Sequence, residues 1–281
     1  MPFANTQQLS PFVRADTLIA QPKANRLFVD VRLGDPDVEL ERFRDSHILG
    51  AVHAQIRDVF AAPATAQSGN LPLPDIDSLR SRLAAWGVDA ETEIVLYGST
   101  PALAARGWWV LRWAGFECVS LLDGGLRAWV AAGGAVARGD APPPRASGGP
   151  APTLTPGNLA DINIAAVSRL ESGTILLDAR DEAAYQAGHI PGARNLPAVS
   201  QWTPTGMLRQ KQVIASQYAE AGIVKGSTVV VYCGGGVLSA LSYVTLVEAG
   251  ISPRLYVGSW SEWNKHRELR LLPADRGQDE H

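Results

Sequence analysis

One cysteine stands where an apolar strand should give way to a glycine-rich turn. Cys233 follows the apolar run 229–232 and precedes Gly234, Gly235 and Gly236, and a helix is expected over 239–249. Glycines let the backbone curl so that N–H groups point at an anion. The first turn of a helix adds positive character at the same spot. This setting favours a thiolate, so Cys233 is predicted to be a nucleophile.

The second cysteine lacks such a setting. Cys118 lies in the apolar run 117–122, where it is expected in the middle of a strand with no glycines around it. A cysteine of that kind usually packs as a small hydrophobic side chain. Two cysteines this far apart show no zinc-ligand spacing, so we expect no metal and no cofactor.

Four sequence blocks occur twice in the same order, which indicates a duplicated domain. The corresponding segments are 27–32 and 175–180, 47–53 and 189–195, 94–97 and 229–232, and 124–129 and 258–263. Gly98 takes the place of Cys233 in the first copy. The first copy is therefore expected to lack a nucleophile.

A stretch rich in proline and glycine, 138–156, separates the copies and predicts a linker. The expected domains are 1–137, which is non-catalytic, and 157–281, which is catalytic. Each copy alternates apolar strands with helical segments, which is typical of an α/β fold with a parallel sheet flanked by helices. Ligands of such sheets bind beyond the carboxyl ends of the strands.

These motifs resemble the rhodanese superfamily in its two-domain sulfurtransferase form. The resemblance spans about 27–263 and rests on the motifs Leu177-Asp178-Ala179-Arg180, Gly188-His189-Ile190-Pro191-Gly192-Ala193, Cys233–Ser239, Leu122-Asp123-Gly124-Gly125-Leu126 with Trp129, and Gly258-Ser259-Trp260-Ser261-Glu262-Trp263. It implies two tandem rhodanese-like domains.

The resemblance implies that Cys233 carries sulfur as a persulfide. The sulfur would come from thiosulfate or 3-mercaptopyruvate and pass to cyanide or a thiol, with no cofactor. Arg180 matches a family arginine that binds the anionic end of the donor. Asp178 and His189 recur in the first copy, which favours a structural role for both. The expected substrate-binding residues are Arg180, Gly234, Gly235, Gly236, Val237, Leu238 and Ser239.

Departures from the family pattern bear on the donor. Thiosulfate-using relatives have basic residues after the cysteine, where this chain has Gly234 and Gly235. The second arginine of mercaptopyruvate-using relatives is missing from 181–187. The histidine that many relatives have just before Pro-Leu-Pro is missing as well, since this chain reads Gly69-Asn70-Leu71-Pro72-Leu73-Pro74. The neutral loop favours 3-mercaptopyruvate over the thiosulfate dianion.

Two other functions are compatible with a cysteine at the end of a strand. A cysteine phosphatase on a related fold needs an arginine six positions after its cysteine to clamp phosphate, and this chain has Ser239 there. A non-catalytic sulfur carrier or regulatory binding module remains the alternative. Turnover with a sulfur donor distinguishes it from an enzyme.

Composition limits the partners. The chain is 46% hydrophobic and 19% charged with a net charge of −3, which gives no electrostatic reason to bind nucleic acid or an anionic membrane. It has no apolar run long enough to span a membrane, and residues 1–6 lack the features of a secretory signal. A cytoplasmic protein with reduced thiols is expected, acting on small molecules, and its oligomeric state is left open.

Overall fold

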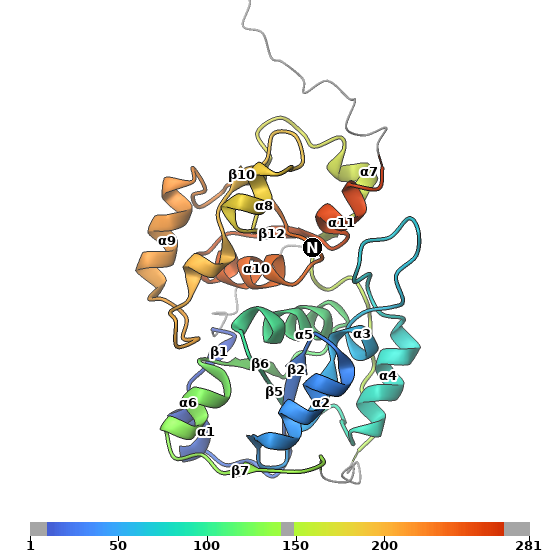
Figure 1. The fold of residues 1–281 in the computed structure, drawn as a ribbon, viewed down its shortest axis with the longest axis vertical. Coiled ribbons are helices and arrows are strands. Elements are labelled where there is room, and N and C mark those ends of the chain that lie inside the picture. Colours follow the sequence, from blue (N-terminus) through green and yellow to red (C-terminus); the bar gives the residue numbers. More distant parts are fainter. Residues whose placement is uncertain (1–9, 142–148, 267–281) are drawn as a thin grey trace, which may run out of the picture.

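The computed structural model contains two parallel sheets, each built from one copy of the duplication (Figure 1). It describes residues 10–141 and 149–266, so the middle of the expected linker and the residues at the signal-peptide position lie outside the described residues. The first sheet has the strand order β1-β6-β5-β2-β4, and the second has the order β10-β9-β11-β12-β8. Matched by position in the repeat, the two orders are the same.

The first unit supplies five parallel strands and a small antiparallel pair, β3–β7. Its strands are β1 (Phe12–Val13), β2 (Arg26–Arg32), β3 (His47–Ile48), β4 (Val52–Gln55), β5 (Glu93–Gly98), β6 (Val119–Leu122) and β7 (Val136–Ala137). Its helices are α1 (Ala15–Ala20), α2 (Pro36–Asp45), α3 (Ile56–Val59), α4 (Ile76–Ala85), α5 (Pro101–Trp113) and α6 (Gly125–Ala131).

The second unit repeats this plan with shorter elements. Its strands are β8 (Asp161–Ile162), β9 (Ile175–Asp178), β10 (Arg194–Asn195), β11 (Val229–Tyr232) and β12 (Pro253–Tyr256). Its helices are α7 (Ile164–Val167), α8 (Glu182–Gln186), the 3₁₀ turn η1 (Ala198–Gln201), α9 (Lys211–Glu220), α10 (Leu238–Glu248) and α11 (Ser259–Trp263). The strands and central helices expected from the sequence are confirmed to within a residue at each end, except that β6 begins at Val119, two residues later than expected.

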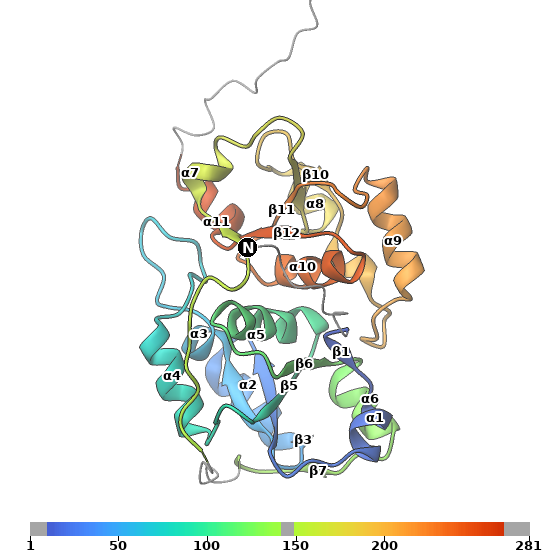
Figure 2. The same cartoon turned by 180° about the vertical axis from the view of Figure 1, so that it is seen from behind.

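The two units meet through α5 and α10, which lie side by side between the sheets in both views (Figures 1 and 2). Both helices are rich in apolar residues and are buried over most of their length. One face of each covers its own sheet, and the other packs on the partner helix. A single hydrophobic cluster therefore runs from the first sheet through both helices to the second sheet.

Separate hydrophobic clusters cover the outer face of each sheet. In the first unit this cluster contains Leu18, Phe43 and Trp129, and in the second it contains Val167, Ile190 and Trp263. Among the described residues, no helix is long and apolar enough to cross a membrane.

Candidate active site

Cys233 lies at the carboxyl end of β11, the central strand of the second sheet. β9 pairs with this strand on one side and β12 on the other. The cysteine is only 2% exposed and belongs to the core shared with α5 and α10. The strand and the glycine turn thus place the thiol at the sheet edge where α/β proteins bind ligands, as expected.

The loop after Cys233 directs two hydrogen-bond donors at its sulfur. The backbone N–H of Gly236 donates to Sγ at 3.1 Å, and the hydroxyl of Ser239 donates to Sγ at 3.4 Å. Gly236 has φ +85°, a conformation that glycine adopts without strain. Both donors stand at the start of α10, whose N-terminal end carries positive character. The arrangement can stabilise an anionic sulfur.

The other expected loop residues form the rim of the site. Gly234 and Gly235 are half-buried, and so are Val237 and Leu238. A Cβ added at Gly234 would meet no atom within 4 Å, so there is open space beside the loop there. Among the loop N–H groups that the structure describes, the one from Gly236 donates to the sulfur. The three glycines had suggested that several N–H groups would do so.

The closing helix α11 holds the cysteine from the other side, a contact that the sequence did not predict. The hydroxyl of Ser259 accepts a hydrogen bond from the Cys233 N–H at 3.2 Å and donates to the Tyr256 carbonyl at 2.9 Å. The N–H of Trp260 donates to the Cys233 carbonyl at 2.9 Å. Ser259 has φ +55°, which is unusual for a residue with a side chain.

The first unit also reaches the site. The N–H of Asn70 donates to the hydroxyl of Ser261 at 2.9 Å, and a Cβ at Gly235 would lie 3.6 Å from the Asn70 Cβ. Arg106 on α5 is fully buried, and burial lowers its pKa to about 10. Arg106 was not among the expected site residues, although an arginine between Ala105 and Gly107, in the middle of a helix expected to be buried, was a signal for it.

Arg180, the expected donor-binding arginine, is held by neighbouring groups. Its Nε and Nη2 form a bidentate pair with Asp178, and Nη2 also donates to the Gly188 carbonyl at 2.7 Å. The guanidinium lies over the rings of Trp260 and Tyr232 at 4.9 and 6.0 Å. Tyr232 packs on the outer face of the sheet, whereas Cys233 packs on the inner face. The structure therefore does not bring Arg180 to the sulfur by any described contact.

The first unit repeats these polar arrangements without a nucleophile. Arg32 pairs with Asp30 through two hydrogen bonds, as Arg180 does with Asp178. His47 bonds to a carbonyl four residues earlier through Nδ1 and stacks on Phe43 at 3.9 Å. His189 makes the same pair of contacts with Tyr185. Because both units share them, these contacts support a structural role for these residues.

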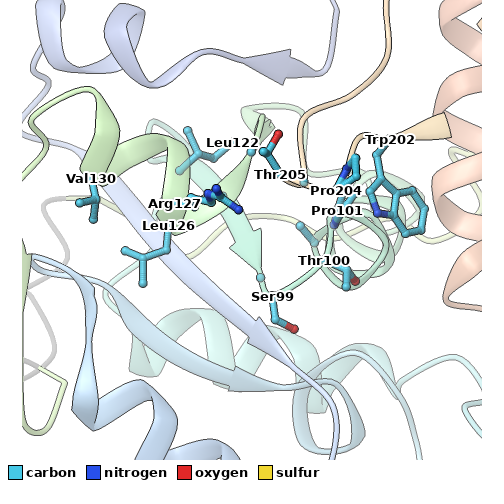
Figure 3. A pocket seen from close by; sticks show the side chains of 15 residues that line it. Ser99, Thr100, Pro101, Leu122, Leu126, Arg127, Val130, Trp202, Pro204 and Thr205 are labelled. Atoms are coloured by element: carbon cyan, nitrogen blue, oxygen red, sulfur yellow. The ribbon is translucent and has the colours of Figure 1, made fainter. Parts of the chain in front are cut away.

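Gly98 stands at the end of β5 where Cys233 stands at the end of β11. A cavity of about 640 Å³ lies beside it, lined by Ser99, Thr100 and Arg127 of the first unit and by Trp202 and Thr205 of the second (Figure 3). No cysteine lines it. The cavity is therefore the first unit's counterpart of the active site, covered by a loop of the second unit.

The prediction that Cys118 packs in the middle of a strand was wrong. The residue lies one position before β6 and is exposed, because the strand begins at Val119. Both cysteines are free thiols, and the buried one is Cys233.

Comparison with known proteins identifies the family. The model of the rhodanese-like domain matches residues 14–132 and again 165–266. A Pseudomonas aeruginosa protein named "Probable 3-mercaptopyruvate sulfurtransferase" is 36% identical, over 89% of this chain and 95% of its own length. A thiosulfate sulfurtransferase from the same organism is 30% identical, over 84% of this chain and 91% of its own.

The structural comparison agrees. The crystal structure of a 3-mercaptopyruvate sulfotransferase from Escherichia coli superposes with a TM-score of 0.76 at 27% identity, over 90% of this chain and all of that one. The sequence resemblance to the family, the tandem parallel sheets and the expected enzyme class are confirmed. The chain belongs to the rhodanese family and is a sulfurtransferase with two rhodanese-like domains.

Proposed function

We propose that Cys233 is the sulfur carrier of this enzyme, taking a sulfur atom from a small donor as a persulfide and passing it to cyanide or a thiol. The observation that carries the proposal is the pair of donors on its sulfur, the Gly236 N–H and the Ser239 hydroxyl. Both are in place before any donor binds, so they stabilise anionic sulfur without reorganisation.

The transfer has two steps. The Cys233 thiolate attacks the sulfur of 3-mercaptopyruvate, an S–S bond forms, and the C–S bond breaks with its electron pair on carbon. The resulting enolate takes a proton and leaves as pyruvate. With thiosulfate the leaving group is sulfite. The acceptor then attacks the outer sulfur, and Cys233 leaves as thiolate. Splitting the transfer in this way is covalent catalysis.

The preferred donor in this proposal is 3-mercaptopyruvate. Relatives of similar length are named for each of the two donors, so the family alone does not decide between them. The loop 234–239 carries no charged side chain, which suits a monoanionic donor better than a dianion. The loop binds the sulfur end of the donor. Arg180 remains a prediction for the carboxylate end, and its bonds to Asp178 and Gly188 would have to rearrange.

The expected domains 1–137 and 157–281, joined by the linker 138–156, have different roles in this function. The second carries the nucleophile, and the first covers the site with Asn70 and α5. A cytoplasmic location belongs to the proposal as well, because a thiol nucleophile with a second free cysteine suits a reducing compartment.

Mass spectrometry after incubation with donor tests the assignment. Cys118→Ser should gain one sulfur atom on Cys233 and keep full turnover, because Cys118 is exposed and lies outside the site. Cys233→Ser should gain no sulfur and lose turnover, since no other buried thiol is described. Turnover retained by Cys233→Ser would overturn the proposal. A protein that takes up sulfur but does not turn over would be a sulfur carrier rather than an enzyme.

A further inference from the structure

A buried arginine of the first domain faces the active-site loop of the second. Arg106 lies in the middle of α5 and is fully buried. Its Nη2 donates to the carbonyls of Phe60 at 3.0 Å and Leu71 at 2.9 Å, and Nε also donates to Phe60. These acceptors are neutral backbone groups. They orient the guanidinium but do not neutralise its charge.

Nothing that the structure describes compensates this charge. Arg106 is in none of the described ion pairs, and its Nη1 is buried without a described hydrogen-bond partner. Burying a charge with no opposite charge is costly, so such groups are usually paired with an anion or a ligand. With a pKa of about 10, the guanidinium is protonated at neutral pH.

The unpartnered nitrogen points at the residue that binds the sulfur. A Cβ added to Gly236 would lie 2.9 Å from Nη1, so the guanidinium is packed directly against this glycine. The N–H of the same glycine donates to the Cys233 sulfur at 3.1 Å. The guanidinium also interacts electrostatically with Cys233. A cation and an anionic sulfur would therefore lie on either side of one glycine residue.

The other described charged groups near β11 do not supply positive charge at Cys233. The Arg180 guanidinium is paired with Asp178 and lies on the outer face of the sheet. Glu262 on α11 lies beside Tyr256, and its negative charge would oppose an anion at Cys233. The loop 234–239 has no charged side chain.

We infer that Arg106 is a positioning residue through which the first domain supplies the positive charge that stabilises anionic sulfur on Cys233. It holds the Gly236 N–H against the sulfur and adds its own charge behind that N–H. This inference rests on the proposed role of Cys233 as the sulfur carrier. It explains how a loop without cations can hold a thiolate and a persulfide anion in a buried site.

The test uses the full-length chain in a Cys118→Ser background, so that Cys233 is its one cysteine. Arg106→Met removes the charge at similar length, and Arg106→Lys keeps the charge. Arg112→Met is the matched control, because Arg112 is on the same helix and bonds to the Glu117 carbonyl at the periphery. The rate at which iodoacetamide alkylates Cys233 is measured as a function of pH. The rate of alkylation by the anionic reagent iodoacetate is then measured at neutral pH.

In Arg106→Met the midpoint of the alkylation profile should move to higher pH by about one unit, which is about a tenfold loss of rate at pH values below both midpoints. The preference for iodoacetate over iodoacetamide should fall as well, because the cation that attracts the anionic reagent is gone. Arg106→Lys and Arg112→Met should keep the parent's profile. A purely structural role would lower the melting temperature without moving either readout.

An unchanged profile and reagent preference in Arg106→Met would overturn the inference. Where Arg106→Met does not fold, Arg106→Lys decides: the parent's profile supports the role of the charge, and a profile moved by about one unit contradicts it. Sulfur uptake by the parent is measured in parallel. A parent that takes up no sulfur refutes the proposed function, whereas the alkylation profiles still report on Arg106.

Discussion

Anionic sulfur in a buried site depends on groups that are already oriented toward it. At Cys233 these are one backbone N–H and one hydroxyl, from Gly236 and Ser239. A side chain at position 236 is disfavoured, because φ is +85° and an added Cβ would lie 2.9 Å from both Arg106 Nη1 and the Val257 carbonyl oxygen. A side chain at this position would push the N–H away from the sulfur. The glycine is therefore needed for the geometry of the site.

The neighbouring glycines have room for side chains, which makes the donor preference testable. The Cβ of an Arg at 234 or a Lys at 235 meets no close contact, since the nearest atom to either added Cβ is the Asn70 Cβ at 3.6 Å. The wild type should have a higher kcat/KM for 3-mercaptopyruvate than for thiosulfate. The double variant Gly234→Arg, Gly235→Lys should shift the ratio toward thiosulfate by about tenfold, because two cations favour a dianion.

The matched control adds the same two charges on the exposed side of α9, as Gln212→Arg and Ser216→Lys. It should leave the ratio unchanged. A wild type that already prefers thiosulfate would show that other residues supply the cations.

At the scale of elements, the turn from β12 into α11 fastens the end of β11. Three of its polar groups reach the cysteine loop: the Ser259 hydroxyl, the Trp260 N–H and the Ser261 N–H, the last of which donates to the Gly234 carbonyl at 2.9 Å. Ser259 keeps a left-handed conformation although it is not glycine. A side chain in a strained conformation persists where its bonds compensate for the strain.

Replacing Ser259 by Ala tests this fastening. The variant keeps the positive φ but loses the bonds to the Cys233 N–H and the Tyr256 carbonyl, which leaves two buried backbone groups without this partner. We expect a loss of about 1–3 kcal/mol in the free energy of unfolding, measured by denaturant titration. Because Cys233 loses an anchor, kcat should fall as well.

Ser168→Ala is the control for this substitution, since Ser168 makes a similar local bond to the Ala165 carbonyl outside the site. It should change the unfolding free energy and kcat little. Equal effects of the two variants would show that the Ser259 bonds have no special part in the site.

At the scale of the whole molecule, the interface between the domains is part of the core. Trp109 on α5 meets Tyr243 on α10 edge to face, with ring centroids 6.0 Å apart. Leu208 of the second unit donates its N–H to the Asp123 carboxylate of the first at 2.7 Å. Removing the first domain would expose the apolar outer side of α10 together with the active-site loop.

The fragment 157–281 is therefore expected to be unstable on its own. It should bind a hydrophobic dye or aggregate, because a large apolar face is exposed to water. Its turnover should be far below that of the full chain, because Asn70 and Arg106 are missing. Co-expression of 1–141 with 149–281 should restore the folded complex and the turnover. A monomeric fragment 157–281 with full activity would show that the first domain is dispensable.

The sequence by itself determined the features that depend on local pattern. Alternating apolar segments predicted the strands and central helices, and the repeated blocks predicted two units of the same topology. The strand, the three glycines and the following helix were enough to place Cys233 at the end of β11. These features depend on residues that are neighbours in the sequence, so the sequence alone is enough to predict them.

Only the tertiary structure decided which side chains meet at the site. Arg106 is 127 positions before Cys233 in the sequence, and the packing of α5 on α10 brings it to the loop. The family resemblance implied that Arg180 binds the donor, and a pair with an Asp was the alternative; its side chain pairs with Asp178 on the other face of the sheet. Cys118 was predicted to be buried in a strand, but it is exposed and precedes the first residue of β6. Spacing cannot tell which partner a side chain takes, because that choice depends on faces and neighbours that form only when the units pack together.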